Sequence, residues 1–144
     1  MTRVYLWGMK QYEIEITLVD EPDKESIATA VYRLTANAAV QRGDAQAVAT
    51  EDNGDLINVF IEDGKKLLEK ALGRYSTGDL GYSMPENWKD RSEDINGHAD
   101  TFLKNYVLAK WYELNGTGER YIAMANEALE CIVTILGKRT KPNR

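Results

Sequence analysis

The residues best suited to catalysis are a single histidine, His98, and a single cysteine, Cys131. A cysteine or serine nucleophile needs a neighbouring base, and imidazole is the usual one near neutral pH. His98 lies near the predicted start of one helix, whereas Cys131 lies in the apolar pattern of another. Nothing in their spacing brings them together. We therefore interpret His98 as a surface or helix-capping residue and Cys131 as a small buried hydrophobic residue.

Acidic residues cluster in 51–55 and at 93–94. The first run, Glu-Asp-Asn-Gly-Asp, lacks the alternating ligands, the correctly placed glycine and the closing glutamate of a calcium loop. Histidine or cysteine pairs with metal-site spacing, phosphate-binding glycine loops and the serine nucleophile elbow are absent. The helix dipole already favours acids at helix starts. The sequence thus predicts a protein that is not an enzyme and has no catalytic residue, cofactor or metal. The least favoured alternative is an enzyme with His98, Glu93 and Asp94 in one pocket.

Any site would have to be positioned by a few helices and strands. Alternating apolar residues over 11–19 predict a strand with one solvent-facing side, and Leu80, Tyr82 and Met84 predict a second short strand within 79–85. Helical periodicity and terminal glycines predict helices over about 22–42, 50–73, 92–114 and 119–137. The third helix starts near Ser92 or, because Asn96-Gly97 interrupts the pattern, closer to His98.

Each of the first two helices has a predicted buried face. In the first, the stripe comprises Ile27, Val31, Leu34 and Ala38; in the second, it comprises Leu56, Phe60, Leu67, Leu68 and Ala71. Gly64 lies close to the second stripe. A close helix–helix crossing would explain a glycine inside a helix, where it costs about 1 kcal/mol relative to alanine.

These elements predict a mainly α fold. We expect a four-helix bundle-like domain, closed by an antiparallel hairpin of the last two helices, with a short two-stranded β ribbon that pairs 11–19 with 79–85. A chain of 144 residues fits a single domain, 1–144. Its expected extensions are an N-terminal strand or arm, 1–19, and a basic C-terminal tail, 138–144.

Charge and composition limit the classes of partner. The net charge of −5 disfavours a general nucleic-acid-binding surface. The tail carries four basic residues that could contact phosphate: Lys138, Arg139, Lys141 and Arg144. We favour a solvated chain end, with DNA contact as the alternative. The first twenty residues lack the pattern of a signal peptide and no long apolar run is present, so we expect an intracellular protein without a membrane span.

The most distinctive segment is 101–114, a helical pattern that is apolar around most of its circumference. Such a helix must be covered on more than one side, either as the central helix of the fold or through contact with another subunit. The second possibility predicts a homo-oligomer. The candidate interface residues are Phe102, Tyr106, Leu108, Trp111 and Tyr112, together with Tyr82 and Trp88.

The order of the predicted elements over most of the chain, and the sequence of roughly the last fifty residues, carry a resemblance to a known family. The residues concerned are Lys-Asn-Tyr-Val-Leu-Ala-Lys-Trp-Tyr at 104–112, Ala-Asn-Glu-Ala at 125–128 and Leu-Gly-Lys-Arg-Thr-Lys-Pro at 136–142. This part resembles small prophage proteins of gut Bacteroidetes that are similar to head–tail adaptor (connector) subunits of tailed phages. Those subunits are small α-helical proteins that assemble as rings beneath the portal.

The resemblance implies a non-enzymatic virion structural protein of the head–tail connector or neck class. Such a protein acts by self-assembly and by contacts with the portal or other virion proteins, and it resides in the bacterial cytoplasm before virion assembly. An alternative is a regulatory or adaptor module that binds a partner protein through the aromatic segment 75–88. In a third interpretation, those aromatic residues only cover the end of the bundle.

Overall fold

The computed structural model describes residues 13–18, 26–42, 48–114 and 119–138. They form four α-helices and a small antiparallel sheet, so the predicted mainly α fold is confirmed. The helices are α1 (Ile27–Arg42), α2 (Gly54–Leu72), α3 (Arg91–Glu113) and α4 (Glu119–Lys138). Three short 3-10 turns, η2 (Glu51–Asn53), η3 (Gly73–Tyr75) and η4 (Glu86–Trp88), flank α2 and precede α3.

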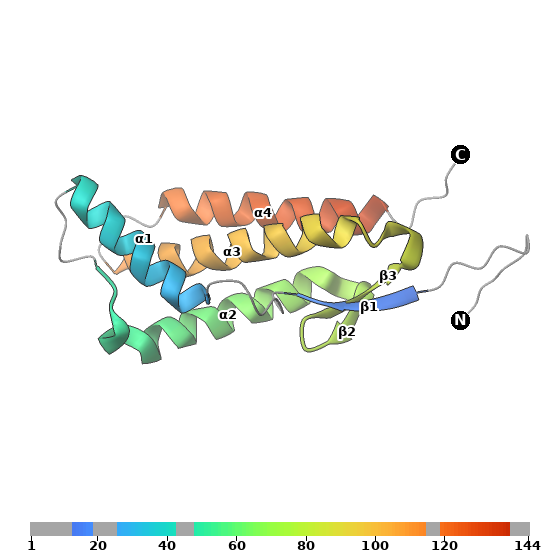
Figure 1. Cartoon of the computed structure of the whole chain (residues 1–144), viewed down its shortest axis with the longest axis horizontal. Helices are drawn as coiled ribbons and strands as arrows, with labels where there is room; N and C mark the ends of the chain where they lie inside the picture. The colour runs from blue at the N-terminus through green and yellow to red at the C-terminus, as the bar shows by residue number, and fades with distance from the viewer. Residues whose placement is uncertain (1–12, 19–25, 43–47, 115–118, 139–144) are drawn as a thin grey trace, which may run out of the picture.

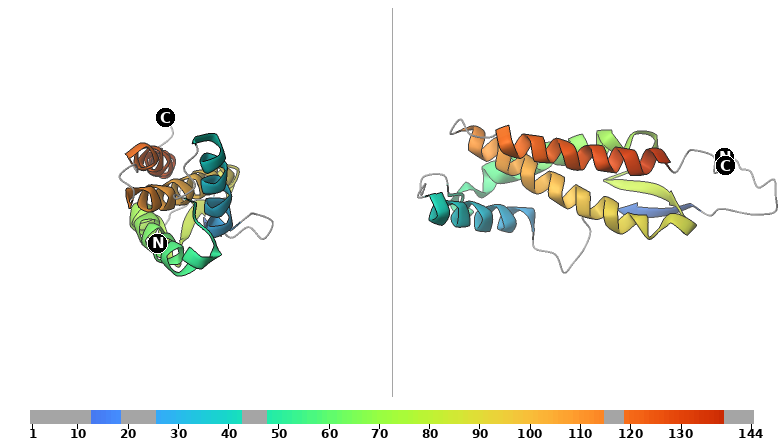
Figure 2. Two further views of the ribbon diagram at one scale, coloured as in Figure 1. Left: turned by 90° about the vertical axis from the view of Figure 1, so that its left-hand side faces the viewer. Right: turned by 90° about the horizontal axis from the view of Figure 1, so that it is seen from above.

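The long helix α3 lies between α4 and α2 (Figure 1). It runs antiparallel to α4, which confirms the predicted closing hairpin. Helix α1 packs against the C-terminal half of α3, whereas the sheet lies beside its N-terminal half (Figures 1 and 2). On the side of α3 that faces away from α4, α1 therefore covers the C-terminal half and the sheet covers the N-terminal half.

The sheet has three strands in the order β1-β3-β2. Strand β1 (Glu13–Thr17) pairs with β3 (Gly81–Pro85), and Ile14 and Ile16 lie opposite Met84 and Tyr82. This confirms the pairing of 11–19 with 79–85. The third strand, β2 (Ser76–Gly78), was not predicted, because three residues that include a glycine are too few to show an alternation.

Helix ends mostly follow the local signals in the sequence. Thr50, the first residue of the predicted second helix, forms an N-cap: its side chain accepts a hydrogen bond from the Asp52 N–H, and Asn53 completes a capping box. Gly73 ends α2 with a φ of +55°, which favours glycine. The expected interruption at Asn96-Gly97 is wrong, since α3 runs through it from Arg91. Burial of Ile95 and Ala99 on either side offsets the low helix propensity of that glycine.

The buried face of α2 differs from the predicted one. It contains Ile57, Ile61, Gly64, Leu68 and Leu72, whereas Leu56 and Leu67 are exposed. The helix carries two apolar rows, and periodicity alone does not tell which of them faces the core. The prediction for Gly64 is confirmed: a Cβ atom there would lie 2.9 Å from Leu103 Cδ2 and 3.1 Å from Tyr106 Cδ2. Helices α2 and α3 therefore cross closely at this glycine.

The core consists of two clusters of buried side chains, and α3 contributes to both. The first joins α3 to α2, α4 and the sheet through residues such as Leu72, Tyr82, Phe102 and Ile132. The second joins the C-terminal half of α3 to α1 and α2 through Val31, Ile57, Val107 and Trp111. The apolar circumference of α3 is thus explained by its central place within one chain.

Candidate functional site

The predicted interface on α3 is wrong, because the side chains assigned to it are buried within the chain itself. Of the seven, six are at most 8% exposed: Tyr82, Phe102, Tyr106, Leu108, Trp111 and Tyr112. The seventh, Trp88, is half-buried against the first core cluster. Helices α1, α2 and α4 and the sheet cover both faces of α3, so a second subunit has no access to these residues.

Aromatic contacts strengthen this packing instead of opening a surface. The rings of Tyr112 in α3 and Tyr121 in α4 stack with centroids 5.1 Å apart, and Phe102 stacks on Tyr106 at 5.6 Å. The Nζ atom of Lys110 lies 5.6 Å from the centre of the Tyr106 ring, within the range of a cation–π contact. The Tyr112–Tyr121 pair joins α3 to α4, whereas the other two pairs lie within α3 and order its side chains.

The aromatic segment 75–88 also turns inward. Leu80, Tyr82 and Met84 are buried, and Tyr75 and Trp88 pack on the same cluster. The Tyr82 hydroxyl lies 3.4 Å from Asn96 Oδ1, to which it donates a hydrogen bond, and burial raises the pKa of Tyr82. The side chains proposed to bind a partner therefore fill the core. Of the alternatives for this segment, the structure favours the one in which it covers part of the bundle.

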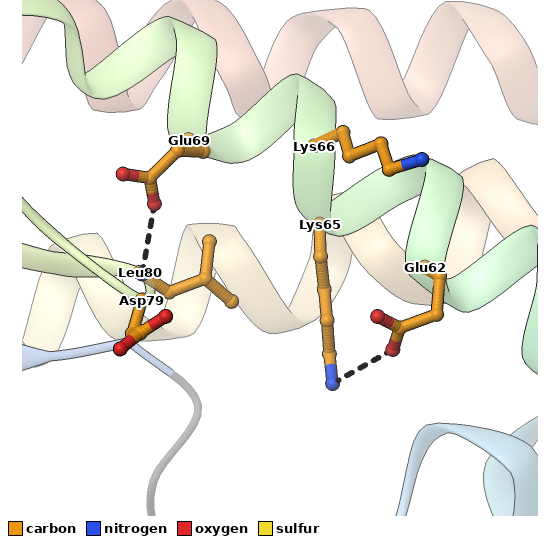
Figure 3. Close-up of a pocket in the computed structure, with 6 residues that line it drawn as sticks. All are labelled: Glu62, Lys65, Lys66, Glu69, Asp79 and Leu80. Atoms are coloured by element: carbon orange, nitrogen blue, oxygen red, sulfur yellow. Dashed lines mark hydrogen bonds and ion pairs between the residues drawn. The ribbon is translucent and has the colours of Figure 1, made fainter.

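A shallow depression of about 500 Å³ lies between α2 and the β2–β3 turn (Figure 3). At this turn, Asp79 and Leu80 both have positive φ, of 51° and 64°. Glu69 of α2 stabilises the turn, since its Oε2 accepts the Leu80 N–H at 2.8 Å and its Oε1 accepts the Ser76 hydroxyl. No sequence signal identified Glu69, because only the fold brings the turn against α2.

The charged residues around this depression indicate a structural contact between α2 and the hairpin and not a ligand-binding site. Its lining residues are Glu62, Lys65, Lys66, Glu69, Asp79 and Leu80, which include charges of both signs. The carboxylate of Glu69 is used by the hairpin, and Lys65 Nζ lies 3.4 Å from Glu62 Oε2 (Figure 3). This leaves no concentration of one charge that would select a ligand.

The residues considered for chemistry are placed in separate parts of the fold. His98 is half-buried early in α3, and Cys131 is half-buried in α4 instead of fully buried as predicted. Glu93 and Asp94 are exposed in the first turn of α3, as Glu51 and Asp52 are beside the Thr50 cap. Among the residues that the structure describes, no group of three or more histidines, cysteines and acids could hold a metal ion.

Two sequence predictions concern residues outside the described part of the chain. The basic tail, Arg139, Lys141 and Arg144, lies there, and Lys138 is the last residue of α4. The N-terminal arm lies there up to residue 12. The arm over 1–12 and the tail's contact with DNA, the alternative to a solvated chain end, therefore stay predictions.

Exposed apolar side chains concentrate on two helices. Within the described residues, α2 exposes Leu56, Val59 and Leu67, and α4 exposes Ile122, Met124 and Val133. A second depression of about 460 Å³ runs along α4 and is lined by Asn126, Leu129, Glu130, Val133 and Thr134. The face of α2 was missed as a candidate surface because two of its residues, Leu56 and Leu67, were assigned to the core stripe of that helix. The second apolar row of α2 was the available signal.

Compared with known proteins, the chain matches no family model, no curated protein and no solved structure. None of the described helices is long and apolar enough to cross a membrane. The exposed faces of α2 and α4 are therefore the features from which a function has to be argued.

Proposed function

We propose that this protein is a non-enzymatic subunit that acts by binding other proteins, including copies of itself. The observation that carries the proposal is the exposed apolar surface of α2 and α4, where Leu56, Val59, Leu67, Ile122, Met124 and Val133 face solvent. Leu56, Val59 and Leu67 share one side of α2, and Ile122 and Val133 share one side of α4. Single exposed apolar residues are common, but several on one helical face are typical of contact surfaces. A helix face binds a partner when such side chains become buried.

The assembly that we propose is the neck of a tailed-phage virion, with the chain as a head–tail connector subunit. The resemblance of the C-terminal hairpin to prophage proteins supports this class, and a small helical domain is suited to it. Ring formation needs two different contact surfaces on each subunit. With α3 buried, the exposed faces of α2 and α4 are contact surfaces that the described part of the chain offers, and the portal is a further proposed partner.

The proposal includes no catalytic step. The carboxylate best placed in a depression, Glu69, is bonded to the β2–β3 hairpin, and His98 and Cys131 lie on different helices. In this role the protein would reside in the bacterial cytoplasm before it joins a virion.

The experiment that tests the proposal is the absolute mass in solution, measured by light scattering over a wide range of concentrations. We expect a mass above that of the 16.3 kDa monomer that rises with concentration. Val59→Asp on α2 and Val133→Asp on α4 should lower it, because each places a charge in an apolar contact. Ala36→Asp, on the exposed side of α1, is the control.

Circular dichroism establishes that each variant is folded. A monomeric mass for the natural chain over the whole range would contradict self-assembly. An oligomer that neither valine substitution affects would contradict the assignment of its surfaces.

A further inference from the structure

The exposed face of α2 is electrically polarised along its length. Residues 51–63 contain five acids and no base, whereas residues 64–75 contain four bases and one acid, Glu69. Glu69 faces the hairpin and is bonded to it. The outward charge therefore changes from negative to positive near the middle of the helix.

One row of exposed side chains carries both this change and the apolar residues. Within α2 the row follows helical spacings of three and four: Leu56, Val59, Asp63, Lys66 and Lys70; Asp52 precedes the helix and Arg74 follows it. Side chains at these spacings lie above one another on one side of a helix. The part of the row within α2, from Leu56 to Lys70, is about 21 Å long, at 1.5 Å of rise per residue.

The helix dipole accounts for only part of the pattern. It favours acids in the first turn and bases in the last turn, but it does not reach the centre of the helix, where Asp63 and Lys66 lie. Within the described residues, Asp55, Asp63, Lys66 and Lys70 take part in no ion pair, whereas the nearby Glu62 and Lys65 pair with each other. The charges at the centre of this face thus have no partner in that part of the chain.

We propose that this face of α2 binds the same face of a second copy of the chain, with the two helices antiparallel. A parallel pair would place acids beside acids and bases beside bases, whereas an antiparallel pair places each acidic half on a basic half. A twofold axis midway between positions 63 and 66 places Asp63 of each copy beside Lys66 of the other copy, so the same ion pair forms twice. This inference rests on the proposed function, since it names the partner of one of the assembly surfaces. A twofold contact uses the same face on both copies and closes a dimer, so the ring of the proposed neck would be built from such dimers through other surfaces, such as the face of α4.

Apolar and charged side chains have different tasks in this contact. Leu56, Val59 and Leu67 supply the area removed from water, and Val59 meets the aliphatic stem of the partner's Lys70. The charges favour the antiparallel orientation and pairing with a second copy of the chain. This selectivity weakens as the salt concentration rises, because salt screens the charges. Because two helices bury less than the roughly 800 Å² per partner of a standard interface, the dimer should depend on concentration.

The test uses two complementary variants of the full chain. Asp55→Lys with Asp63→Lys reverses two charges of the acidic half, and Lys66→Glu with Lys70→Glu reverses two charges of the basic half; all four positions are exposed. Sedimentation equilibrium should show the natural chain forming dimers, each variant alone dimerising at least about tenfold more weakly, and their mixture forming a heterodimer. Ala36→Lys and Ala36→Glu on α1 are controls for charge alone.

Orientation is tested by cross-linking in a Cys131→Ser background. Val59→Cys mixed with Lys70→Cys should form a disulfide-linked dimer under mild oxidation, whereas Val59→Cys alone should not. In the antiparallel pair, the two copies of position 59 lie about 16 Å apart along the axis.

A monomeric natural chain would overturn this inference and the proposed self-assembly together. An oligomer that all four charge reversals leave unchanged, or a mixture without a heterodimer, would overturn the antiparallel contact while the proposed function stands on the face of α4.

Discussion

At the scale of single residues, burial changes the chemistry of Tyr82 more than its one weak hydrogen bond does. Its side chain is fully buried in β3, and removal from water raises its pKa above the usual value of about 10. The folded state thus favours the neutral phenol. This contribution to stability is complete below the unfolded-state pKa and is lost as the pH rises above it.

Tyr82→Phe should therefore change how stability depends on pH. At pH 7 the variant should lose about 1 kcal/mol, because one hydrogen bond to Asn96 is removed. Above about pH 10 the natural chain should lose stability faster than the variant, so the difference should shrink or reverse. Urea unfolding at a series of pH values measures both curves. Parallel curves up to pH 11 would show that Tyr82 does not titrate differently in the two states.

At the scale of elements, Gly64 determines how closely α2 approaches α3. Gly64→Ala should lower the free energy of unfolding by about 1 kcal/mol, since overpacking of about 1–3 kcal/mol outweighs the helix propensity gained. The Cβ atom would press on the Tyr106 ring, which stacks on Phe102 and has little room to move.

Gly97 in α3 is the matched control for this substitution. Nothing lies within 4 Å of a Cβ atom built there, so Gly97→Ala should stabilise the chain by up to about 1 kcal/mol. Chemical denaturation of both variants measures the two changes. An equal gain for both alanines would mean that the α2–α3 crossing accommodates a methyl group.

These two helices also show what the sequence could and could not predict. The existence of all four helices, the Thr50 cap, the Gly73 stop and the pairing of β1 with β3 follow from local signals. The orientation of α2 does not, because its rows Ile57–Ile61–Leu68 and Leu56–Leu67 are both apolar and only tertiary contacts choose between them. Because of the same ambiguity, Leu56 and Leu67 were assigned to the core and the exposed surface of α2 was not predicted. Glu69 escaped prediction because its partners are seven and eleven residues away, in a turn.

At the scale of the whole molecule, α3 makes one cooperative unit of the two core clusters. Phe102 and Leu103 belong to the first cluster, and Val107 and Trp111, one or two turns further along, belong to the second. Loss of either cluster removes the cover from part of the same helix. The two halves of the bundle should therefore unfold together in a single transition.

Trp111→Ala tests this cooperativity and, at the same time, the placement of α3. The side chain is 7% exposed within one chain, so its truncation should lower the free energy of unfolding by about 3–5 kcal/mol. Secondary structure and tertiary packing, followed by far- and near-ultraviolet circular dichroism, should be lost together. Val40→Ala, at an exposed site on α1, should change stability by less than about 0.5 kcal/mol. If the Trp111→Ala protein kept its stability but no longer associated, Trp111 would lie in a subunit interface. That result would support the interface role first predicted for α3.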